Sequence, residues 1–287
     1  MTAGTSANLG GSVHITPPMG LPHGYTAPLA RAIRERAGLT VIVTGRINQP
    51  QIAERILAAG EADLCGMTRA MIADPEMPRK ARTGESGTIR ACIACNQSCI
   101  GRAHKDLGIS CIQFPESGRE LRFSSPPAVR ARARVIVVGG GPGGMKAASV
   151  AAARGHAVEL WEAAPRLGGQ ALLAQLLPGR EEFGGIVDNL ARALGPGVAI
   201  RTGQRANAEN LRASSPDTVV LATGARPYVP PLESADARHI LTAWQVLQGE
   251  RVGGRVVIAD WKADWIGLGI AEKLAREGAS VRLRINA

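Results

Sequence analysis

The sequence contains 287 residues, of which 45% are hydrophobic, so the chain can bury more than one apolar core. No apolar run reaches the roughly 18 residues that a membrane-spanning helix requires, and we therefore expect a cytoplasmic protein that does not enter a membrane. The formal net charge is +10, but the 34 basic residues include only five lysines and the arginines are scattered, which argues against nucleic-acid binding.

Residues 1–88 combine a loop-like start with alternating helical and strand patterns. Residues 1–19 are rich in Gly, Ser, Thr and Pro and predict a loop. The periodicity then predicts a helix at 27–36, a strand at 40–44, a helix at 50–59 closed by Gly60, a strand at 62–67 and a helix starting at Asp74-Pro75. A strand, a crossover helix and a second strand predict a parallel pair.

Each of these two strands ends in a turn that suits a phosphate. Gly45-Arg46 follows the first strand, and Gly66 with Thr68-Arg69 follows the second. Glycine lets backbone N–H groups approach a ligand, and arginine offers a fork of donors. In (β/α)8 barrels a phosphate site commonly lies behind strands seven and eight. The plainer alternative is that the two arginines are surface residues that cap strand ends.

Four of the five cysteines lie within twenty residues, at Cys92, Cys95, Cys99 and Cys111. Spacings of two and three residues fold three thiolates around one point, and the fourth returns from beyond a loop, which is typical of a [4Fe–4S] cluster. The main alternative is tetrahedral zinc, but its second Cys-x-x-Cys pair is missing. Unligated or disulfide-bonded cysteines are disfavoured, because no signal peptide indicates an oxidising compartment.

A family resemblance rests on the residues around these cysteines, Ile-Arg-Ala-Cys-Ile-Ala-Cys-Asn-Gln at 89–97 and Cys-Ile-Gln at 111–113. They resemble the cluster segment of the iron–sulfur flavoproteins that include 2,4-dienoyl-CoA reductase and trimethylamine dehydrogenase. Those proteins run from an FMN-carrying (β/α)8 barrel, through the cluster, to a nucleotide-binding module. The resemblance covers nearly the whole chain and implies that it is incomplete at both ends.

The resemblance implies that residues 1–88 are the C-terminal part of the FMN barrel and that 89–133 are the cluster segment and linker. Eight βα units need about 250 residues, so roughly six strands would come from an upstream barrel chain. The residues implied at the flavin phosphate are Gly45, Arg46, Gly66, Thr68 and Arg69.

Two histidines, His14 and His23, lie in the loop that faces the substrate in the family. A histidine there is suited to moving a proton near neutral pH, so both are candidate catalytic residues. The alternative is that both are solvent-exposed loop residues.

A new domain is expected after a linker at 115–133, which contains Ser124-Ser125-Pro126-Pro127. A buried strand at 134–138 runs directly into a glycine-rich turn and a helix that ends at Arg154. Glycines at the first, third and sixth positions provide a tight turn, an approach to pyrophosphate and a helix–strand contact. The alternative is a glycine turn without a ligand. The turn contains Gly139, Gly141, Gly143 and Gly144.

The next strand, at 157–161, ends at Glu162, whose carboxylate stands where the adenosine ribose hydroxyls are bound. Further on, Gly168-Gly169-Gln170 and Pro178-Gly179-Arg180 resemble the family's FAD-contacting turns. A strand at 218–221 followed by Thr223-Gly224 resembles the segment that closes the flavin site in two-dinucleotide oxidoreductases. The family resemblance therefore implies FAD or ADP in this site.

The pattern begins again at 255–287, with a strand at 255–259, a helix at 266–277 and a strand from Ser280. Aligning the two strands without gaps places Asp260, Lys262 and Trp265 opposite the three fingerprint glycines. We therefore predict that this half binds neither NAD nor NADP. The stretch 261–269 resembles the amine-dehydrogenase side of the family more than the reductase side.

The sequence thus predicts an α/β chain made of a (β/α)8-barrel tail, an iron–sulfur segment and an incomplete Rossmann-like two-half module at 134–287. The implied function is that of an oxidoreductase fragment with FMN, a [4Fe–4S] cluster and FAD or ADP. Its parent would oxidise or demethylate an N-methylated amine and pass electrons from FMN through the cluster. The alternatives are an NAD(P)H-dependent 2,4-dienoyl-CoA reductase and a catalytically silent fragment. Expected partners are a small-molecule substrate, the upstream barrel chain, an electron-transfer flavoprotein and, when complete, further copies of itself.

Overall fold

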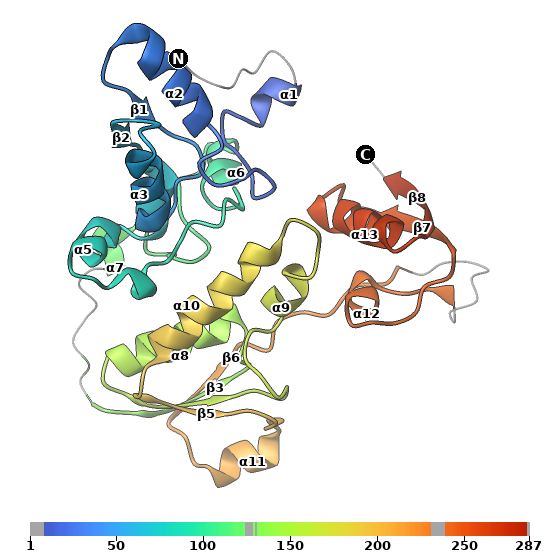
Figure 1. Ribbon diagram of the computed structural model, residues 1–287. Helices are drawn as coiled ribbons and strands as arrows, with labels where there is room; N and C mark the ends of the chain where they lie inside the picture. Colours follow the sequence, from blue (N-terminus) through green and yellow to red (C-terminus); the bar gives the residue numbers. More distant parts are fainter. Residues whose placement is uncertain (1–8, 124–128, 130, 231–238, 286–287) are drawn as a thin grey trace. The chain divides into compact units, whose positions relative to one another are not determined.

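The structure is a computed structural model that describes residues 9–123, 129, 131–230 and 239–285 (Figure 1). The chain divides into two compact units, Met1–Ala128 and Val129–Ala287. The predicted Ser124-Ser125-Pro126-Pro127 linker lies outside the described residues. None of the helices in the described ranges is both long enough and apolar enough to cross a bilayer.

The first unit contains short helices and one two-stranded sheet. Its elements are α1 (Leu9–Ser12), α2 (Ala27–Ala37), β1 (Ile42–Val43), α3 (Pro50–Ala58), β2 (Leu64–Cys65), α4 (Thr68–Ala73), α5 (Met77–Arg82), η1 (Ser86–Thr88), α6 (Ile100–Ala103) and α7 (Glu120–Phe123). The parallel pairing of β1 with β2 is confirmed, with Ile42 opposite Leu64. Two expectations were wrong. Residues 9–12 form the helical turn α1 within the stretch expected to be a loop. The helix expected from Asp74 starts at Met77 instead, since α4 extends to Ala73, directly before Asp74.

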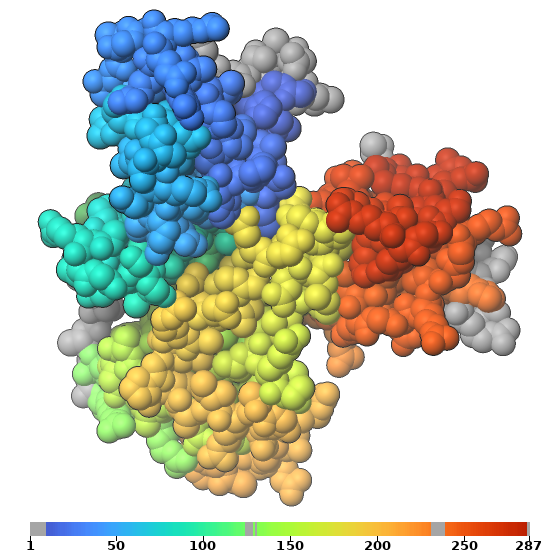
Figure 2. Space-filling model, in the orientation of Figure 1, coloured from blue at the N-terminus to red at the C-terminus, as the bar shows by residue number. Residues whose placement is uncertain are grey.

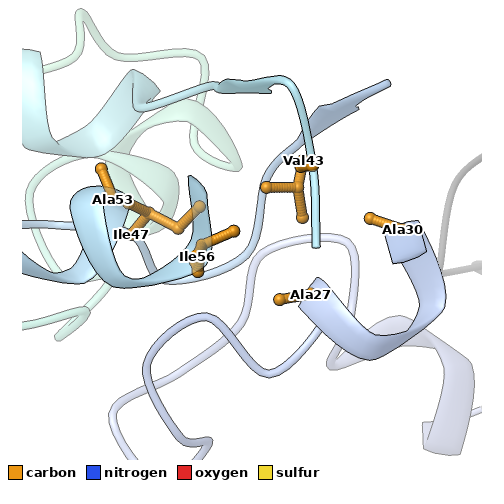
Figure 3. Packing of buried hydrophobic residues seen from close by; sticks show 7 residues of the cluster. Ala27, Ala30, Val43, Ile47, Ala53 and Ile56 are labelled. Carbon is orange, nitrogen blue, oxygen red and sulfur yellow. The ribbon is translucent and has the colours of Figure 1, made fainter. Parts of the chain in front are cut away.

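The core of this unit lies between α2, β1 and α3. Helices α2 and α3 both carry proline in their first turn, where the missing N–H has no intrahelical acceptor to lose. Figure 3 shows the side chains that face one another here, and the buried cluster consists of Ala27, Ala30, Val43, Ile47, Ala53, Ile56 and Ala62.

Both strands are shorter than predicted, because within the described residues β1 and β2 form a ladder only with each other. Ile42 is 61% exposed and Leu64 is 52% exposed. Each strand therefore has one apolar side chain without a covering layer.

The second unit contains a four-stranded sheet and a smaller lobe that follows it. Its elements are β3 (Arg134–Val138), α8 (Pro142–Ala153), β4 (Ala157–Trp161), α9 (Ala171–Ala174), η2 (Glu181–Phe183), α10 (Gly184–Leu194), β5 (Val198–Arg201), α11 (Ala208–Ala213), β6 (Thr218–Leu221), α12 (Ala243–Leu247), β7 (Arg255–Asp260), α13 (Trp265–Arg276) and β8 (Ser280–Ile285).

The four-stranded sheet is parallel throughout and has the order β5-β4-β3-β6. Helices α8 and α10 lie on one face and α11 lies on the other (Figure 1). On the α11 face, Leu211 packs against Ile136, Val138 and Trp161. The α/β class with parallel sheets is therefore confirmed.

The smaller lobe contains α12, α13 and the parallel pair of β7 and β8. Leu177, from the segment after α9, is buried against Ile270 and Leu274 of α13. The space-filling view shows this segment in yellow against the red atoms of α13 (Figure 2). Hydrophobic packing thus joins the lobe to the four-stranded part of the unit.

Candidate functional site

The glycines that follow β1 and β2 both stand in close contacts, Gly45 with the start of α2 and Gly66 with the end of β1. Gly45 has a φ of 147°, and a Cβ built there would lie 2.3 Å from Oγ1 of Thr26. A Cβ on Gly66 would lie 2.6 Å from Cγ2 of Thr44. A larger residue at 45 would push the turn away from the start of α2, and one at 66 would push the two turns apart, so both glycines are explained by packing as well as by a ligand.

The two arginines of these turns have different environments. Arg46 is buried in a left-handed conformation (φ 52°), and its Nη1 donates to the carbonyls of Met19 and Leu21. Its Nη2 lies 2.8 Å from Nε2 of His23. Arg46 therefore holds the loop that carries His23, and its assignment to the flavin phosphate stays a prediction.

Arg69 has one edge fixed by the protein and one edge open. Its Nη1 donates to the carbonyl of Pro17 at 2.9 Å and to Oδ1 of Asn96 at 2.6 Å. Nε and Nη2 make no hydrogen bond within the part of the chain that the structure describes. Thr68 is exposed at the first position of α4. Of the predicted phosphate side chains, Arg69 is the better placed to receive an anion.

The two candidate histidines make separate contacts. His14 Nδ1 lies 3.2 Å from the hydroxyl of Tyr25, and the two rings are 5.5 Å apart. His23 contacts Arg46 instead. Since a guanidinium only donates, His23 Nε2 accepts this bond and is occupied. The proposed proton-transfer role of either histidine stays a prediction.

The four clustered cysteines are half-buried, and none forms a disulfide. Within the described ranges, no three His, Cys, Asp or Glu side chains lie close enough together to hold a single metal ion. The four thiols nevertheless lie within electrostatic reach of one another. Burial, together with the neighbouring charges of Cys92, Cys99 and Cys111, raises the pKa of Cys95 to about 11, although a hydrogen bond from the N–H of Gln97 opposes the rise.

The backbone around these cysteines is shaped to present N–H groups to sulfur. The N–H of Ala94 donates to Sγ of Cys92 and the N–H of Gln113 donates to Sγ of Cys111, both at 3.4 Å. Ala94 (φ 50°) and Asn96 (φ 56°) both adopt the left-handed conformation that non-glycine residues rarely take. Strain on both sides of Cys95 is typical of a loop that wraps a ligand.

Side-chain amides hold this loop to the rest of the unit. Nδ2 of Asn48 donates to the carbonyl of Cys92 at 2.7 Å, and Nε2 of Gln113 donates to the carbonyl of Ala91 at 2.8 Å. Oδ1 of Asn48 is buried and has no partner among the described residues. No sequence pattern points to Asn48, because only the folded chain brings it to a cysteine 44 residues away.

A buried carboxylate anchors the entrance to the loop. Asp74 is fully buried and accepts from Nζ of Lys80 at 2.6 Å and from the N–H of Arg90 at 3.0 Å. Burial alone would raise its pKa, but these hydrogen bonds and the two positive charges outweigh burial and lower it. The Arg90 guanidinium also lies over the ring of Phe114, 4.5 Å from its centre. Asp74 thus joins α5 to the start of the cysteine segment, and Arg90 in turn contacts Phe114 at its end.

In the second unit, the fingerprint glycines have three distinct environments. Gly139 has a φ of 108°, and a Cβ there would lie 2.3 Å from the carbonyl oxygen of Ala222. A Cβ on Gly144 would lie 1.8 Å from the carbonyl oxygen of Gly139. A Cβ on Gly141 would lie 3.9 Å from the nearest atom, and a Cβ on Gly143 would meet nothing within 4 Å. Packing within the protein therefore requires glycine at 139 and 144 but leaves space at 141.

The N-terminus of α8 is open to an anion. Its N-cap residue is Gly141, and no side chain caps the first turn. It lies between β3 and β6, where the strand order of the sheet reverses and where open α/β sheets bind ligands. Unsatisfied N–H groups and the helix dipole favour a phosphate at this position.

Most of the other predicted nucleotide-site residues gather around this turn. Oε2 of Glu162 accepts from the N–H of Gly140 at 2.6 Å, and Oε1 accepts from the N–H of Ala164 at 2.7 Å. The Gly169 Cα lies 3.9 Å from the Cβ position of Gly141. Beside the turn, a Cβ on Gly224 would meet Nε2 of Gln170 at 3.3 Å, and one on Gly139 would meet the Thr223 nitrogen at 3.1 Å.

Arg180 makes a different contact from the one predicted. Its guanidinium lies over the indole ring of Trp265 at 5.1 Å, and Phe183 stacks on the same ring at 5.4 Å. Trp265 is the first residue of α13. The predicted flavin contact of Arg180 stays a prediction, whereas its contact with the smaller lobe is observed.

The turn between β7 and α13 is filled by the chain's own carboxylates. Oδ1 of Asp260 accepts from the N–H groups of Lys262 and Ala263 at 2.9 and 3.1 Å. Oδ1 of Asp264 caps α13 by accepting from the N–H of Ile266 at 2.8 Å. The donors that an open turn would offer to a pyrophosphate are therefore already paired with carboxylates.

The ungapped alignment of the two halves needs one correction. Helix α13 starts at Trp265, so its third residue is Gly267, whereas the third residue of α8 is Gly144. A Cβ on Gly267 would lie 2.3 Å from Oδ2 of Asp260, so this glycine also permits a close contact between helix and strand. Trp265 therefore does not replace Gly144; the second turn is longer and retains one of the three glycines.

Comparison with known proteins identifies two matching families. Residues 133–283 match the family model of pyridine nucleotide-disulphide oxidoreductases, and residues 22–87 match that of the NADH:flavin oxidoreductase / NADH oxidase family. The two matches fall in the second and first units, respectively.

The matching relatives are longer proteins. The chain is 39% identical over 274 residues to an NADH oxidase of Thermoanaerobacter brockii, covering 93% of this chain and 42% of the relative. It is 37% identical over 284 residues to N,N-dimethylglycine/sarcosine dehydrogenase of Chromohalobacter salexigens, covering 94% and 40%. The solved structure of 6-hydroxypseudooxynicotine amine oxidase from Pseudomonas geniculata matches with 28% identity and a TM-score of 0.86, covering 94% and 43%. The chain thus spans about two fifths of the length of the relatives it matches.

Proposed function

The chain belongs to the pyridine nucleotide-disulphide oxidoreductase family, and from this premise we propose that it is the electron-transfer part of a flavin- and iron–sulfur-dependent oxidoreductase. The complete reaction would be the oxidation or demethylation of an N-methylated amine. Similarity to N,N-dimethylglycine/sarcosine dehydrogenase supports this substrate class. An electron-transfer flavoprotein is the acceptor that we propose for its electrons.

The observation that carries the proposal is the arrangement of the four cysteine thiols. They are free, they lie within electrostatic reach of one another, and backbone N–H groups donate to the sulfurs of Cys92 and Cys111. The spacing of two and three residues with a distal cysteine suits a four-iron cluster, whereas the common zinc arrangement needs a second Cys-x-x-Cys pair. Cys92, Cys95, Cys99 and Cys111 would hold that cluster, which supplies one-electron transfer. The N–H groups that donate to sulfur would stabilise its negative charge.

In the first unit, the exposed apolar residues of β1 and β2 support a barrel completed by other strands. Ile42 and Leu64 need a covering layer, and both strands have an edge that no described strand pairs with. We propose that an upstream polypeptide supplies the remaining strands and that FMN binds only to the completed barrel. The open edge of Arg69 would then bind the flavin phosphate.

In the second unit, the strand order β5-β4-β3-β6 corresponds to 3-2-1-4 in chain order and supports a Rossmann-like nucleotide site. The open N-terminus of α8 would hold the pyrophosphate of ADP or FAD, and Glu162 would bind the ribose. The alternative function, an NAD(P)H-dependent reductase, is favoured by similarity to an NADH oxidase. The carboxylates that fill the second turn argue against it, because they occupy the donors that a nicotinamide dinucleotide would need.

The proposal is tested by metal analysis of anaerobically purified protein. About four iron and four sulfide per chain are expected, because this ligand pattern suits a four-iron cube. Serine at any of the four clustered cysteines should lower iron retention. Cys65 is a matched control, since it lies in β2 and its thiol contacts the carbonyl of Ala53. One zinc per chain without visible absorption, or equal iron loss in Cys65→Ser, would contradict the cluster assignment.

A further inference from the structure

One side chain in the cysteine loop contacts the arginine of the second phosphate turn. Oδ1 of Asn96 accepts from Nη1 of Arg69 at 2.6 Å, and Nδ2 of Asn96 donates to the carbonyl of Thr16 at 3.0 Å. The same Nη1 donates to the carbonyl of Pro17 at 2.9 Å. A single amide thus connects the residue after Cys95 to two segments that are far away in sequence.

The backbone at Asn96 is part of the same arrangement. Its φ of 56° is left-handed, a conformation that asparagine tolerates better than most residues. Its carbonyl accepts from the N–H of Gly101 at 2.8 Å, which closes the turn that contains Cys99. Asn96 therefore fixes the spacing between two cysteines with its backbone and the position of the whole loop with its side chain.

Only one edge of the Arg69 guanidinium takes part in this contact. Its Nη1 edge is committed to the loop, and Nε and Nη2 have no acceptor within the described residues. A guanidinium is planar, so fixing one edge also fixes the direction of the other.

We propose that Asn96 is a positioning residue that fastens the cysteine loop to Arg69, so that the flavin-phosphate arginine and the cluster ligands are held as one unit. This inference rests on the proposed function, which assigns the two groups their ligands. It predicts that Asn96 and Arg69 restrain the movement of the cysteine loop through the same contact. Removing either should loosen the loop, and removing both should add little.

The test is a double-mutant cycle on the full chain with Asn96→Ala and Arg69→Gln. The first readout is the rate at which an iron chelator strips the anaerobically loaded protein. Each single variant should lose iron about tenfold faster, as expected for the loss of a charge-assisted hydrogen bond, and the double variant should be no faster than the quicker single variant. Asn48→Ala is the matched control, because Asn48 contacts the carbonyl of Cys92 but not Arg69. The increase in the rate of iron loss caused by Asn48→Ala should multiply with the increase caused by Arg69→Gln, because the two side chains make independent contacts.

A second readout separates this inference from the assignment of the cluster. Amide hydrogen exchange of residues 92–101 in metal-free protein should show the same non-additive pattern, since the contact does not require iron. Asn96→Gly keeps the left-handed backbone without the strain that alanine meets there, so it isolates the loss of the side chain and should still show faster exchange that is non-additive with Arg69→Gln. If wild-type protein takes up no iron, the proposed function fails, and the exchange measurements still decide this inference. Multiplicative effects of Asn96→Ala and Arg69→Gln in the exchange measurements, or wild-type exchange in Asn96→Gly, would overturn it.

Discussion

Three alanine substitutions in the turn after β3 separate nucleotide binding from folding. At Gly144 the new methyl group would lie 1.8 Å from the carbonyl oxygen of Gly139, at Gly141 it would lie 3.9 Å from the nearest atom, and at Gly143 it would meet nothing within 4 Å. None of the three has a positive φ. The substitutions therefore differ in the space around the methyl group rather than in backbone strain.

The expected sizes follow from these distances. Gly144→Ala forces α8 away from the end of β3 and should destabilise the second unit by about 3 kcal/mol, the upper range for overpacking. Gly143→Ala is in the first turn of α8 and should stabilise it by up to about 1 kcal/mol, because alanine favours a helix over glycine. Alanine is a poorer N-cap residue than glycine, so Gly141→Ala should lower the stability of the second unit by about 0.5 to 1 kcal/mol. Its methyl group, however, stands where a pyrophosphate must approach, and losing one charge-assisted hydrogen bond there should weaken binding at least about tenfold.

The assay combines thermal unfolding followed by circular dichroism with calorimetric titration of ADP into the full chain. The expected result is weak binding with a near-normal Tm for Gly141→Ala, a strongly lowered Tm for Gly144→Ala, and wild-type binding for Gly143→Ala. Wild-type affinity for ADP in Gly141→Ala would show that the nucleotide does not bind at this turn. A wild-type Tm in Gly144→Ala would show that the helix and strand are not in close contact.

Three further predictions concern the other parts of the chain. Asp74→Asn should destabilise the first unit by about 2 kcal/mol at neutral pH. Because the pKa of Asp74 is lowered in the folded protein, this stabilisation is fully present above the usual value of 3.8 and is lost as the pH falls through the folded pKa. Equal unfolding curves of the two proteins at pH 7 would contradict this prediction. The chain alone should not retain FMN on gel filtration, but should do so when co-expressed with a polypeptide that supplies the remaining strands, and tight one-to-one binding by the chain alone would refute the incomplete barrel. NADH should not bind at the β7–α13 turn when ADP fills the first site, because its N–H donors are paired with Asp260 and Asp264, and micromolar binding of NADH to the unsubstituted chain under these conditions would contradict this.

The helices and parallel strand pairs were predictable because their signals are local. Proline at the start of a helix, glycine at its end and a period of 3.6 or 2 residues act within a few positions of the chain. The helix predicted at 27–36 is observed at Ala27–Ala37, and that predicted at 50–59 is observed at Pro50–Ala58. The glycine turn after β3 was predictable for the same reason, since strand, turn and helix are consecutive in sequence.

The side-chain environments were not predictable, because they depend on residues that are distant in sequence. Arg46 and Arg69 both follow a short strand closely in the sequence, yet the first is buried in a turn against Met19 and Leu21, and the second lies in the first turn of α4 with an edge that makes no hydrogen bond to the described residues. The difference arises from where the loop at 14–23 lies. No pattern within the two turns encodes that position.

The cysteine loop and the second turn show the limit most clearly. The spacing of the cysteines predicted a soft metal centre, but the contact between Asn96 and Arg69 spans 27 residues and exists only in the folded chain. In the second half, equal strands suggested an ungapped alignment, whereas α13 starts later and Gly267 takes the position that Gly144 has in α8. Sequence patterns fix which donors and thiols are present. Which of them the chain satisfies itself and which remain for a ligand is decided by packing, because a hydrogen bond forms only where two groups meet within about 3 Å.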